Sequence, residues 1–259
     1  MRGVRVLTMS LIAAGAVIHS EAAKYNAADH RTFVAVYQHA YNFEWLKYLM
    51  YVPADYLKSG KSYPLIVYFH GAEQKGDDPD LLRVCALNKQ LDENKKEKFP
   101  FIVISPQLPG KPGFEMPYSM DRGTWYSGKF LSEVNDLLDH IIARYAVDTN
   151  RIYCAGASMG GFATWEMAIR YPHRFAAIAP CCGEGDPSQV CAIKDVPVWV
   201  FHAEADEIMP VKGSDDMISA LKACGGKVEF VRPAGGDHEK CWSNQFDELY
   251  KWLLTHNKN

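Results

Sequence analysis

Ser158 lies between two glycines in the sequence Gly-Ala-Ser-Met-Gly, just after a run of strand-forming residues. The pattern G-x-S-x-G is typical of a sharp strand-to-helix turn that exposes a serine hydroxyl as a nucleophile. It also occurs by chance, and Gly156 and Gly160 could instead serve the close packing of a helix on a strand. A serine nucleophile needs a base to take its proton and a carboxylate to orient that base. The sequence must therefore supply an acid and a histidine near Ser158.

An acid and a histidine follow in the chain. Asp206 ends the apolar run at residues 196–206, and His238 comes after the predicted strand at residues 227–235. The order serine, acid, histidine is that of hydrolases with such a turn. Because open α/β sheets bind ligands at the carboxyl ends of their strands, we expect these residues to meet there as nucleophile, acid and base.

Other residues of the same types are open alternatives, but their positions fit less well. The competing acids are Glu204, Glu207 and Asp237. The other histidines considered are His70, His173, His202 and His256. Asp206 is favoured because it comes directly after its strand. His238 is favoured because His202 lies within a strand-like run and His256 lies in the C-terminal tail.

Attack on an ester also needs N–H donors for the negative charge that develops on the carbonyl oxygen. The N–H of Met159, at the start of the helix after Ser158, is one predicted donor, and the helix dipole favours an anion there. Ala72, in the loop after residues 63–71, is predicted to provide the second. We interpret His70 as a structural residue that shapes this loop.

The elements around these residues alternate along the chain. Predicted strands cover residues 32–37, 46–53, 63–71, 99–107, 151–158, 175–183, 196–206 and 227–235. Predicted helices cover residues 130–145, 161–171, about 213–224 and 243–254. The runs at residues 63–71 and 99–107 are continuously apolar, as in strands buried on both faces. The pattern predicts a single α/β domain with a mostly parallel central sheet and helices on both faces.

A long segment rich in glycine, proline and aromatic residues, at residues 108–126, interrupts this alternation. Loops of this length in compact domains are usually functional. Gln107 and Trp125 are therefore predicted to contact the substrate, although either could instead serve packing.

The first 22 residues have the features of a secretory signal. A short basic segment precedes an apolar run at residues 6–18, and the small residues Ser20 and Ala22 suit signal peptidase. The run is too short to span a hydrocarbon core of about 30 Å; the alternative is a buried N-terminal helix. We predict a protein that is secreted or periplasmic, with a mature domain at residues 23–259 and no stable membrane insertion.

Charge and cysteine usage limit the other function classes. The chain has 28 basic and 31 acidic residues, a net charge of −3, and no basic stripe, so nucleic acid is not predicted as a partner. Neither C-x-x-C nor H-x-x-x-H occurs, and no metal or cofactor is predicted. Of the seven cysteines, Cys154 is predicted to be a small buried residue. One disulfide is expected among the others near the sheet edge, with the pairing open: Cys181, Cys182, Cys191 and Cys241.

Several segments in combination resemble one family. They lie at residues 63–78, 103–109, 148–183, 196–211 and 235–254. Together they resemble the α/β-hydrolase esterases of the polyhydroxybutyrate-depolymerase-like and dienelactone-hydrolase-like group, over roughly residues 45–255. That group includes feruloyl and acetylxylan esterases and proteins described as predicted peptidases. The resemblance implies that Ser158, Asp206 and His238 form a triad, with Ala72 and Met159 as oxyanion donors.

Two departures from the family pattern stand out. Glu73, Gln74 and Lys75 follow Ala72 where the family usually has a further glycine, and His202-Ala203 stands where it usually has His-Gly. The resemblance implies a secreted serine carboxylesterase without a cofactor, acting on feruloyl or acetyl esters of plant polysaccharide. The alternatives are a serine peptidase, a polyester depolymerase, or an inactive relative that binds carbohydrate. The oligomeric state is left open.

Overall fold

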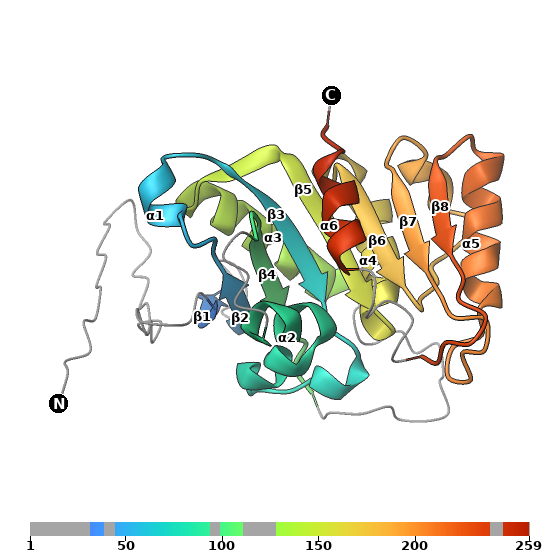
Figure 1. Ribbon diagram of the computed structural model, residues 1–259, viewed down its shortest axis with the longest axis horizontal. Helices are drawn as coiled ribbons and strands as arrows, with labels where there is room; N and C mark the ends of the chain where they lie inside the picture. The colour runs from blue at the N-terminus through green and yellow to red at the C-terminus, as the bar shows by residue number, and fades with distance from the viewer. Residues whose placement is uncertain (1–31, 39–44, 94–98, 111–127, 239–245, 259) are drawn as a thin grey trace.

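An eight-stranded sheet runs through the computed structural model, which describes residues 32–38, 45–93, 99–110, 128–238 and 246–258 (Figure 1). The strands are β1 (Thr32–Gln38), β2 (Trp45–Tyr51), β3 (Tyr63–Phe69), β4 (Ile102–Pro106), β5 (Val147–Ala157), β6 (Ala177–Cys181), β7 (Val198–Phe201) and β8 (Val228–Val231). Their order across the sheet is β1-β2-β4-β3-β5-β6-β7-β8. β1 and β2 pair antiparallel and β2 is antiparallel to β4, while every pair from β4 to β8 is parallel.

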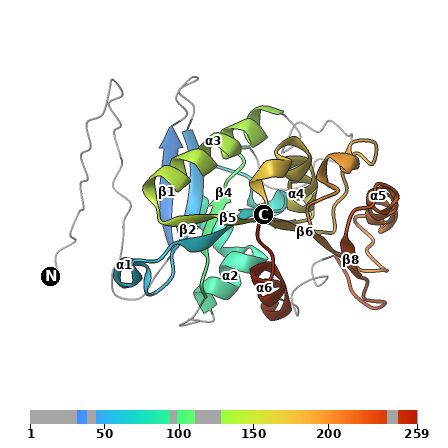
Figure 2. The ribbon, with the colours of Figure 1, turned by 90° about the horizontal axis from the view of Figure 1, so that it is seen from above.

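Helices cover both faces of the sheet (Figure 2). They are α1 (Tyr56–Ser59), α2 (Ala86–Glu93), α3 (Gly128–Arg144), α4 (Met159–Arg170), α5 (Lys212–Ala223) and α6 (Phe246–Leu254). Buried residues of α3, α4 and α5 belong to one hydrophobic cluster, and those of α2 and α6 belong to a second cluster on the opposite face. The predicted mostly parallel sheet with helices on both faces is confirmed.

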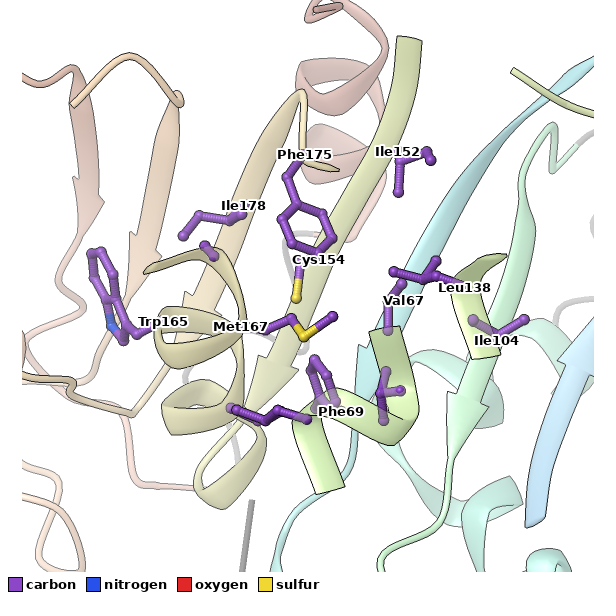
Figure 3. Packing of buried hydrophobic residues seen from close by; sticks show 14 of the residues in the cluster. Val67, Phe69, Ile104, Leu138, Ile152, Cys154, Trp165, Met167, Phe175 and Ile178 are labelled. Carbon is purple, nitrogen blue, oxygen red and sulfur yellow. The ribbon is translucent and has the colours of Figure 1, made fainter. Parts of the chain in front are cut away.

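The buried strands explain why the sequence reads as continuous apolar runs. Successive side chains of β3 point to opposite faces, so Val67 packs with the cluster of α3 and α4, whereas Tyr68 packs with that of α2 and α6. Every residue of β3 and β4 is buried. Figure 3 shows the first cluster, where strand side chains meet Leu138 of α3 and Met167 of α4. A strand covered on both faces has no polar side, and this favours a central position.

The predicted strand at residues 196–206 is longer than the observed one. β7 ends at Phe201, and the following residues form a loop that carries Asp206. The predicted strand at residues 227–235 likewise shortens to β8 (Val228–Val231), and His238 lies in the loop beyond it. Asp206 and His238 therefore lie on loops at the carboxyl edge of the sheet. The directions of their side chains are not set by the alternation of side chains along a strand.

One disulfide is present among the described residues, and it corrects an expectation. Cys191 pairs with Cys224, at a Cα–Cα distance of 5.5 Å that suits a disulfide. The expected group of Cys181, Cys182, Cys191 and Cys241 thus omitted Cys224, the partner that Cys191 has in the structure. Cys224 caps the C-terminus of α5 and meets the 3-10 helix η4 (Val190–Ile193), which contains Cys191. This contact depends on how α5 packs, which the sequence pattern does not specify.

Two further expectations concern the termini and Cys154. Cys154 is buried in β5, as predicted, and burial raises the pKa of its thiol well above the ordinary value. Within the described residues no helix is both long and apolar enough to cross a membrane. The predicted signal segment at residues 1–22 lies outside the described residues.

Candidate active site

Ser158 occupies the turn between β5 and α4 and has an unusual backbone conformation. Its φ is 58° and its ψ is −122°; among the described residues other than glycine, it shares a positive φ only with Cys182. Its N–H donates to the Cys181 carbonyl oxygen at 2.9 Å, and its own carbonyl oxygen accepts from the Gly161 N–H at 2.8 Å. Backbone strain of this kind persists where surrounding bonds hold it, and it is common at functional sites.

The glycines around Ser158 leave no room for side chains. A Cβ on Gly156 would lie 2.4 Å from the Gly160 carbonyl oxygen, and a Cβ on Gly160 would lie 2.0 Å from the Phe69 carbonyl oxygen. A Cβ on Gly161 would lie 2.3 Å from the Cys181 carbonyl oxygen. The helix therefore approaches β3, β5 and β6 at backbone contact. The two interpretations of the glycine pattern, close packing and a strained serine turn, describe one structure.

Asp206 and His238 are in direct contact. Nδ1 of His238 lies 2.7 Å from Oδ2 of Asp206, whose other oxygen accepts from the N–H groups of Ile208 (2.9 Å) and Met209 (2.8 Å). Asp206 is only 8% exposed. A carboxylate can only accept, so the His238 proton lies on Nδ1 and the neutral ring presents Nε2 as the acceptor. This is the arrangement required of an orienting acid and a base.

The competing acid Glu204 points elsewhere. Its carboxylate pairs with the Arg232 guanidinium, which also bonds the Asp215 carboxylate at 2.9 Å. The Arg232 contact lowers the pKa of Glu204. Glu204 therefore helps to join the loops after β7 and β8 on the surface, while Asp206 faces His238.

The contact between Asp206 and His238 contributes to a shift in the pKa of both groups. Burial disfavours the charged His238 ring, but contacts with the Cys182 side chain and the Asp206 carboxylate outweigh it and raise the pKa of His238 to about 9. Burial likewise opposes the charge on Asp206, but the Met209 N–H, His238 and the Ile208 N–H together lower the pKa of its carboxyl group. The site therefore favours the ion pair of carboxylate and imidazolium.

Cys181, the last residue of β6, and Cys182, which follows it, connect the serine turn with the histidine. The Cys181 carbonyl oxygen accepts from Ser158, and the Cys182 Sγ lies 3.8 Å from the His238 carbonyl oxygen. The Cys182 N–H donates to the Phe201 carbonyl oxygen at 2.8 Å, which joins this segment to the end of β7. The structure thus places Ser158, Asp206 and His238 after the carboxyl ends of β5, β7 and β8, with Asp206 and His238 in contact, and their roles as nucleophile, acid and base stay predictions.

The loop that carries Ala72 is held by His70. The Leu108 N–H donates to His70 Nε2 at 2.9 Å, so the ring proton lies on Nδ1, which donates to the Gly71 carbonyl oxygen at 2.6 Å. Burial lowers the pKa of His70 to about 4 and keeps the ring neutral. In a trans peptide the C=O and the following N–H point in opposite directions. By fixing the Gly71 carbonyl, His70 fixes the direction of the Ala72 N–H.

This loop lies directly beside the serine turn. A Cβ built on Gly71 would come within 3.9 Å of the Ser158 Cβ. Ala72 begins the 3-10 helix η1 (Ala72–Gln74) and is buried, whereas the Glu73 side chain is exposed to solvent. Met159 is the first residue of α4, where a helix leaves its N–H without an intrahelical acceptor. These positions suit the predicted donors, and the exposed Glu73 keeps its carboxylate in water.

Gln107 holds the loop after Ala72, which agrees with the packing alternative for this residue. The side chain is 2% exposed, and its Nε2 donates to the carbonyl oxygens of Gln74 (3.1 Å) and Asp78 (2.8 Å). Its Oε1 has no partner among the described residues. Gln107 therefore brackets the loop after Ala72. Its predicted contact with substrate stays a prediction, and Trp125 lies outside the described residues.

A cluster near the site has residue types that metals prefer. Cys182, His202 and Asp206 bring one ligand atom each within 4.8 Å of one another. However, both nitrogens of His202 and both oxygens of Asp206 have protein partners at 2.7–2.9 Å. We therefore treat the cluster as part of the hydrogen-bond network around the acid.

A cavity lies at the opposite end of the sheet. It has a volume of about 380 Å³ and is lined by residues at the start of β7 and β8 and at the ends of α5 and α6, among them Lys227 and Trp252. Asp206 and His238 follow the other ends of the same strands, so this cavity is separate from the candidate active site.

The chain is similar to known proteins over most of its length. The profile of the phospholipase/carboxylesterase family matches residues 57–257, which is most of the chain. The chain belongs to this family. A solved thermostable esterase is 30% identical and aligns over 88% of this chain and 64% of its own, with a TM-score of 0.76. A dienelactone hydrolase described as putative, from Klebsiella pneumoniae, aligns over 87% of this chain with a TM-score of 0.66 at 16% identity and shows the shared fold alone. The α/β-hydrolase fold is thus confirmed.

Curated relatives carry esterase names. The bifunctional acetylxylan esterase/xylanase XynS20E of Neocallimastix patriciarum is 26% identical over 73% of this chain and 26% of its own length. Poly(3-hydroxyalkanoate) depolymerase C of Paucimonas lemoignei is 32% identical over 46% of this chain and 28% of its own. The chain spans 18–41% of the lengths of eight curated relatives that it matches. The expected resemblance to acetylxylan and feruloyl esterases and to a depolymerase is confirmed.

The His70 contacts predict an effect on catalysis as well as on stability. In His70→Phe the buried Leu108 N–H loses its acceptor, which should lower the free energy of unfolding by about 1–3 kcal/mol in urea titrations. Because the Ala72 N–H is no longer held in direction, kcat for p-nitrophenyl acetate should fall roughly 100-fold. His140→Phe on α3, another histidine whose pKa burial lowers to about 4, serves as the control and should keep kcat. Full kcat in His70→Phe would contradict the role of His70.

Proposed function

We propose that this protein is a secreted serine carboxylesterase that hydrolyses acetyl or feruloyl esters of plant polysaccharide. The observation that carries the proposal is the strained Ser158 turn beside the hydrogen-bonded pair Asp206–His238. Membership of the phospholipase/carboxylesterase family supports the reaction class.

In the proposed reaction, Ser158 Oγ attacks the carbonyl carbon of the ester while His238 Nε2 accepts the hydroxyl proton. The carbonyl oxygen becomes an oxyanion, and the N–H groups of Ala72 and Met159 stabilise it. As the C–O bond breaks, His238 gives its proton to the leaving alcohol, and the acyl group remains on Ser158. Water then attacks the acyl-enzyme with His238 as base, and the carboxylic acid leaves.

Asp206 acts in this scheme as the partner of His238 in both half-reactions. Its carboxylate is held by two backbone N–H groups and directs Oδ2 toward the ring. The negative charge stabilises the imidazolium that forms when Ser158 loses its proton. The reaction as proposed uses only protein groups and water, so no cofactor or metal is assigned to it.

The substrate class rests on the relatives and on the surroundings of the acid. Acetylxylan esterases and the feruloyl esterase B of Neurospora crassa are among the relatives, the latter 32% identical over 37% of this chain. Ile208, whose N–H bonds Asp206, has a 57% exposed apolar side chain, and we infer that it lies at the rim of the site. An uncharged acyl or aryl group suits such a rim.

A second candidate function is hydrolysis of peptides. Dipeptidyl-peptidase 5 of Porphyromonas gingivalis is 29% identical over 51% of this chain and 18% of its own length. A serine, acid and histidine can cleave an amide by the same steps. A polyester depolymerase and an inactive carbohydrate-binding relative complete the alternatives. The export proposal, with removal of residues 1–22 and a mature domain at residues 23–259, stands beside each of these functions.

A substrate panel tests the proposed function. The protein, with Ser158→Ala as the matched inactive variant, is assayed with p-nitrophenyl acetate, methyl ferulate, acetylated xylan and a peptide p-nitroanilide. We expect ester hydrolysis by the wild type to be at least about 1,000-fold faster than by Ser158→Ala, because the covalent route is lost. Faster cleavage of the amide than of the esters would favour the peptidase. A folded wild type that cleaves none of the substrates would favour the inactive relative.

The raised pKa of His238 predicts an alkaline rate profile. The neutral ring is the base, so kcat/KM for a neutral ester should rise with pH and level off above about 9. The same contact should stabilise the fold fully below the ordinary value of 6.5 and lose this contribution as pH rises through about 9. Rates corrected with Ser158→Ala and urea midpoints, both followed from about pH 6 to about pH 10, check the two effects. A rate limb near 6.5 would contradict the raised value.

A further inference from the structure

We propose that His202 is a positioning residue for the catalytic acid Asp206. Its hydrogen bonds fix the turn that contains Asp206 and connect this turn to α4, the helix that begins after Ser158. The inference rests on the proposed function and goes beyond it, because His202 lies outside the predicted triad. The sequence placed His202 in a strand-like run, and the family pattern singled it out only for the alanine that follows it.

His202 is buried beside Asp206, and its Nε2 lies 3.4 Å from Oδ2, the oxygen that also contacts His238. It is 1% exposed and follows the last residue of β7, and its N–H donates to the Val231 carbonyl oxygen at 3.1 Å. Its Nε2 lies 2.9 Å from the Met209 carbonyl oxygen, and its Nδ1 lies 2.8 Å from the Ser214 Oγ. Both ring nitrogens are therefore used within the protein.

The partners determine where the ring carries its proton. A carbonyl oxygen can only accept, so Nε2 of His202 carries a hydrogen. The same nitrogen lies 3.4 Å from Oδ2 of Asp206, so this N–H also presents its positive end to the carboxylate. The Ser214 hydroxyl has a single hydrogen, which can serve Nδ1 of His202 or the Gly183 carbonyl oxygen but not both at once. His202 thus places a donor near the negative charge on Asp206, at a longer distance from Oδ2 than the 2.7 Å of the His238 contact.

Met209 is hydrogen-bonded to both Asp206 and His202. Its N–H donates to Asp206 Oδ1 at 2.8 Å, while its carbonyl oxygen accepts from His202. Met209 is 7% exposed, so its carbonyl would lose its donor in a dry environment if His202 were removed. One residue therefore joins the acid to the buried histidine. With Oδ1 fixed by this turn, Oδ2 is left to face His238.

Ser214 extends the connection to the nucleophile helix. It lies on α5, is fully buried, and its Oγ lies 3.1 Å from the Gly183 carbonyl oxygen. The same carbonyl accepts from Nε1 of Trp165 on α4 at 3.3 Å. A Cβ on Gly183 would lie 2.5 Å from the Gly161 carbonyl carbon, so the two backbones touch. The network thus runs from the acid turn to the helix that begins after Ser158.

The titratable groups near the acid come from three elements. Cys182 follows β6, His202 follows β7, and His238 follows β8; each has an atom close to Asp206 or His238. The Glu204 carboxylate is instead bonded to the Arg232 guanidinium. A change in how firmly Asp206 faces His238 should therefore appear in the titration of His238.

Two substitutions separate the contacts of His202. In His202→Gln the side-chain amide can reach the position of Nε2 and donate to Met209, whereas in His202→Asn it reaches only the position of Nδ1, beside Ser214. We expect His202→Asn to lower kcat for p-nitrophenyl acetate roughly 10- to 100-fold with little change in KM, because a small displacement of a reacting group has such an effect. His202→Gln should keep most of kcat. The alkaline rate limb, expected near 9 in the wild type, should move to lower pH in His202→Asn.

Ser214→Ala and Ser105→Ala form a matched pair. Both serines are fully buried and hydrogen-bonded, but Ser105 bonds Asn88, far along the sheet from the acid turn. Ser214→Ala should lower kcat and shift the rate limb in the direction of His202→Asn, while Ser105→Ala should affect only the free energy of unfolding. If His202→Asn does not fold, this pair decides the proposal by itself.

Three results would overturn the proposal: wild-type kcat in folded His202→Asn, equal losses in the Asn and Gln variants, or lower stability with an unmoved rate limb. A wild type without esterase activity would count against the proposed function instead. The positioning role is then decided by an NMR titration of the His238 ring. A lower pKa in His202→Asn than in the wild type supports it, and an equal pKa contradicts it.

Discussion

The contact on which the site depends is the approach of α4 to the sheet at backbone distance. Gly156, Gly160 and Gly161 face the carbonyl oxygens of neighbouring segments so closely that no side chain would fit. This contact forces the chain to turn within one residue at Ser158, which accepts a positive φ. The N–H of Ser158 is then tied to the Cys181 carbonyl oxygen, so the strained turn is held from both sides.

Buried polar side chains fix the loops around that turn. His70 holds the Gly71 peptide, Gln107 brackets the segment after it, and His202 holds the Met209 carbonyl. Each of these side chains is almost fully buried, so leaving its partners without a hydrogen bond would cost free energy. These hydrogen bonds therefore constrain the loops at the carboxyl edge. The same bonds let the predicted triad residues lie in turns and loops and still be held in place.

The sequence was sufficient to predict the fold, and it placed Asp206 and His238 at one edge of the sheet, where the structure shows them in contact. Apolar runs at β3 and β4 and the amphipathic pattern of α3 predict buried strands and covering helices. The hydrogen-bond partners of Gln107 and His202 were not predicted, because Gln74, Asp78, Met209 and Ser214 are chosen by tertiary packing. The same holds for Cys191–Cys224, where the end of α5 decides the pairing. Residue type and spacing report periodic burial, and they carry little information on hydrogen bonds between loops.

The central claim is that Ser158, on its strained turn, is a nucleophile whose hydroxyl proton is accepted by His238. Labelling with a fluorophosphonate, followed by mass spectrometry of the proteolytic peptides, tests it most directly, because the probe reacts with an activated serine whatever the natural substrate. The account predicts one adduct, on the peptide that contains Ser158, and its loss in Ser158→Ala and in His238→Ala. A folded wild type that takes up no probe, or takes it up at another serine, would contradict the account.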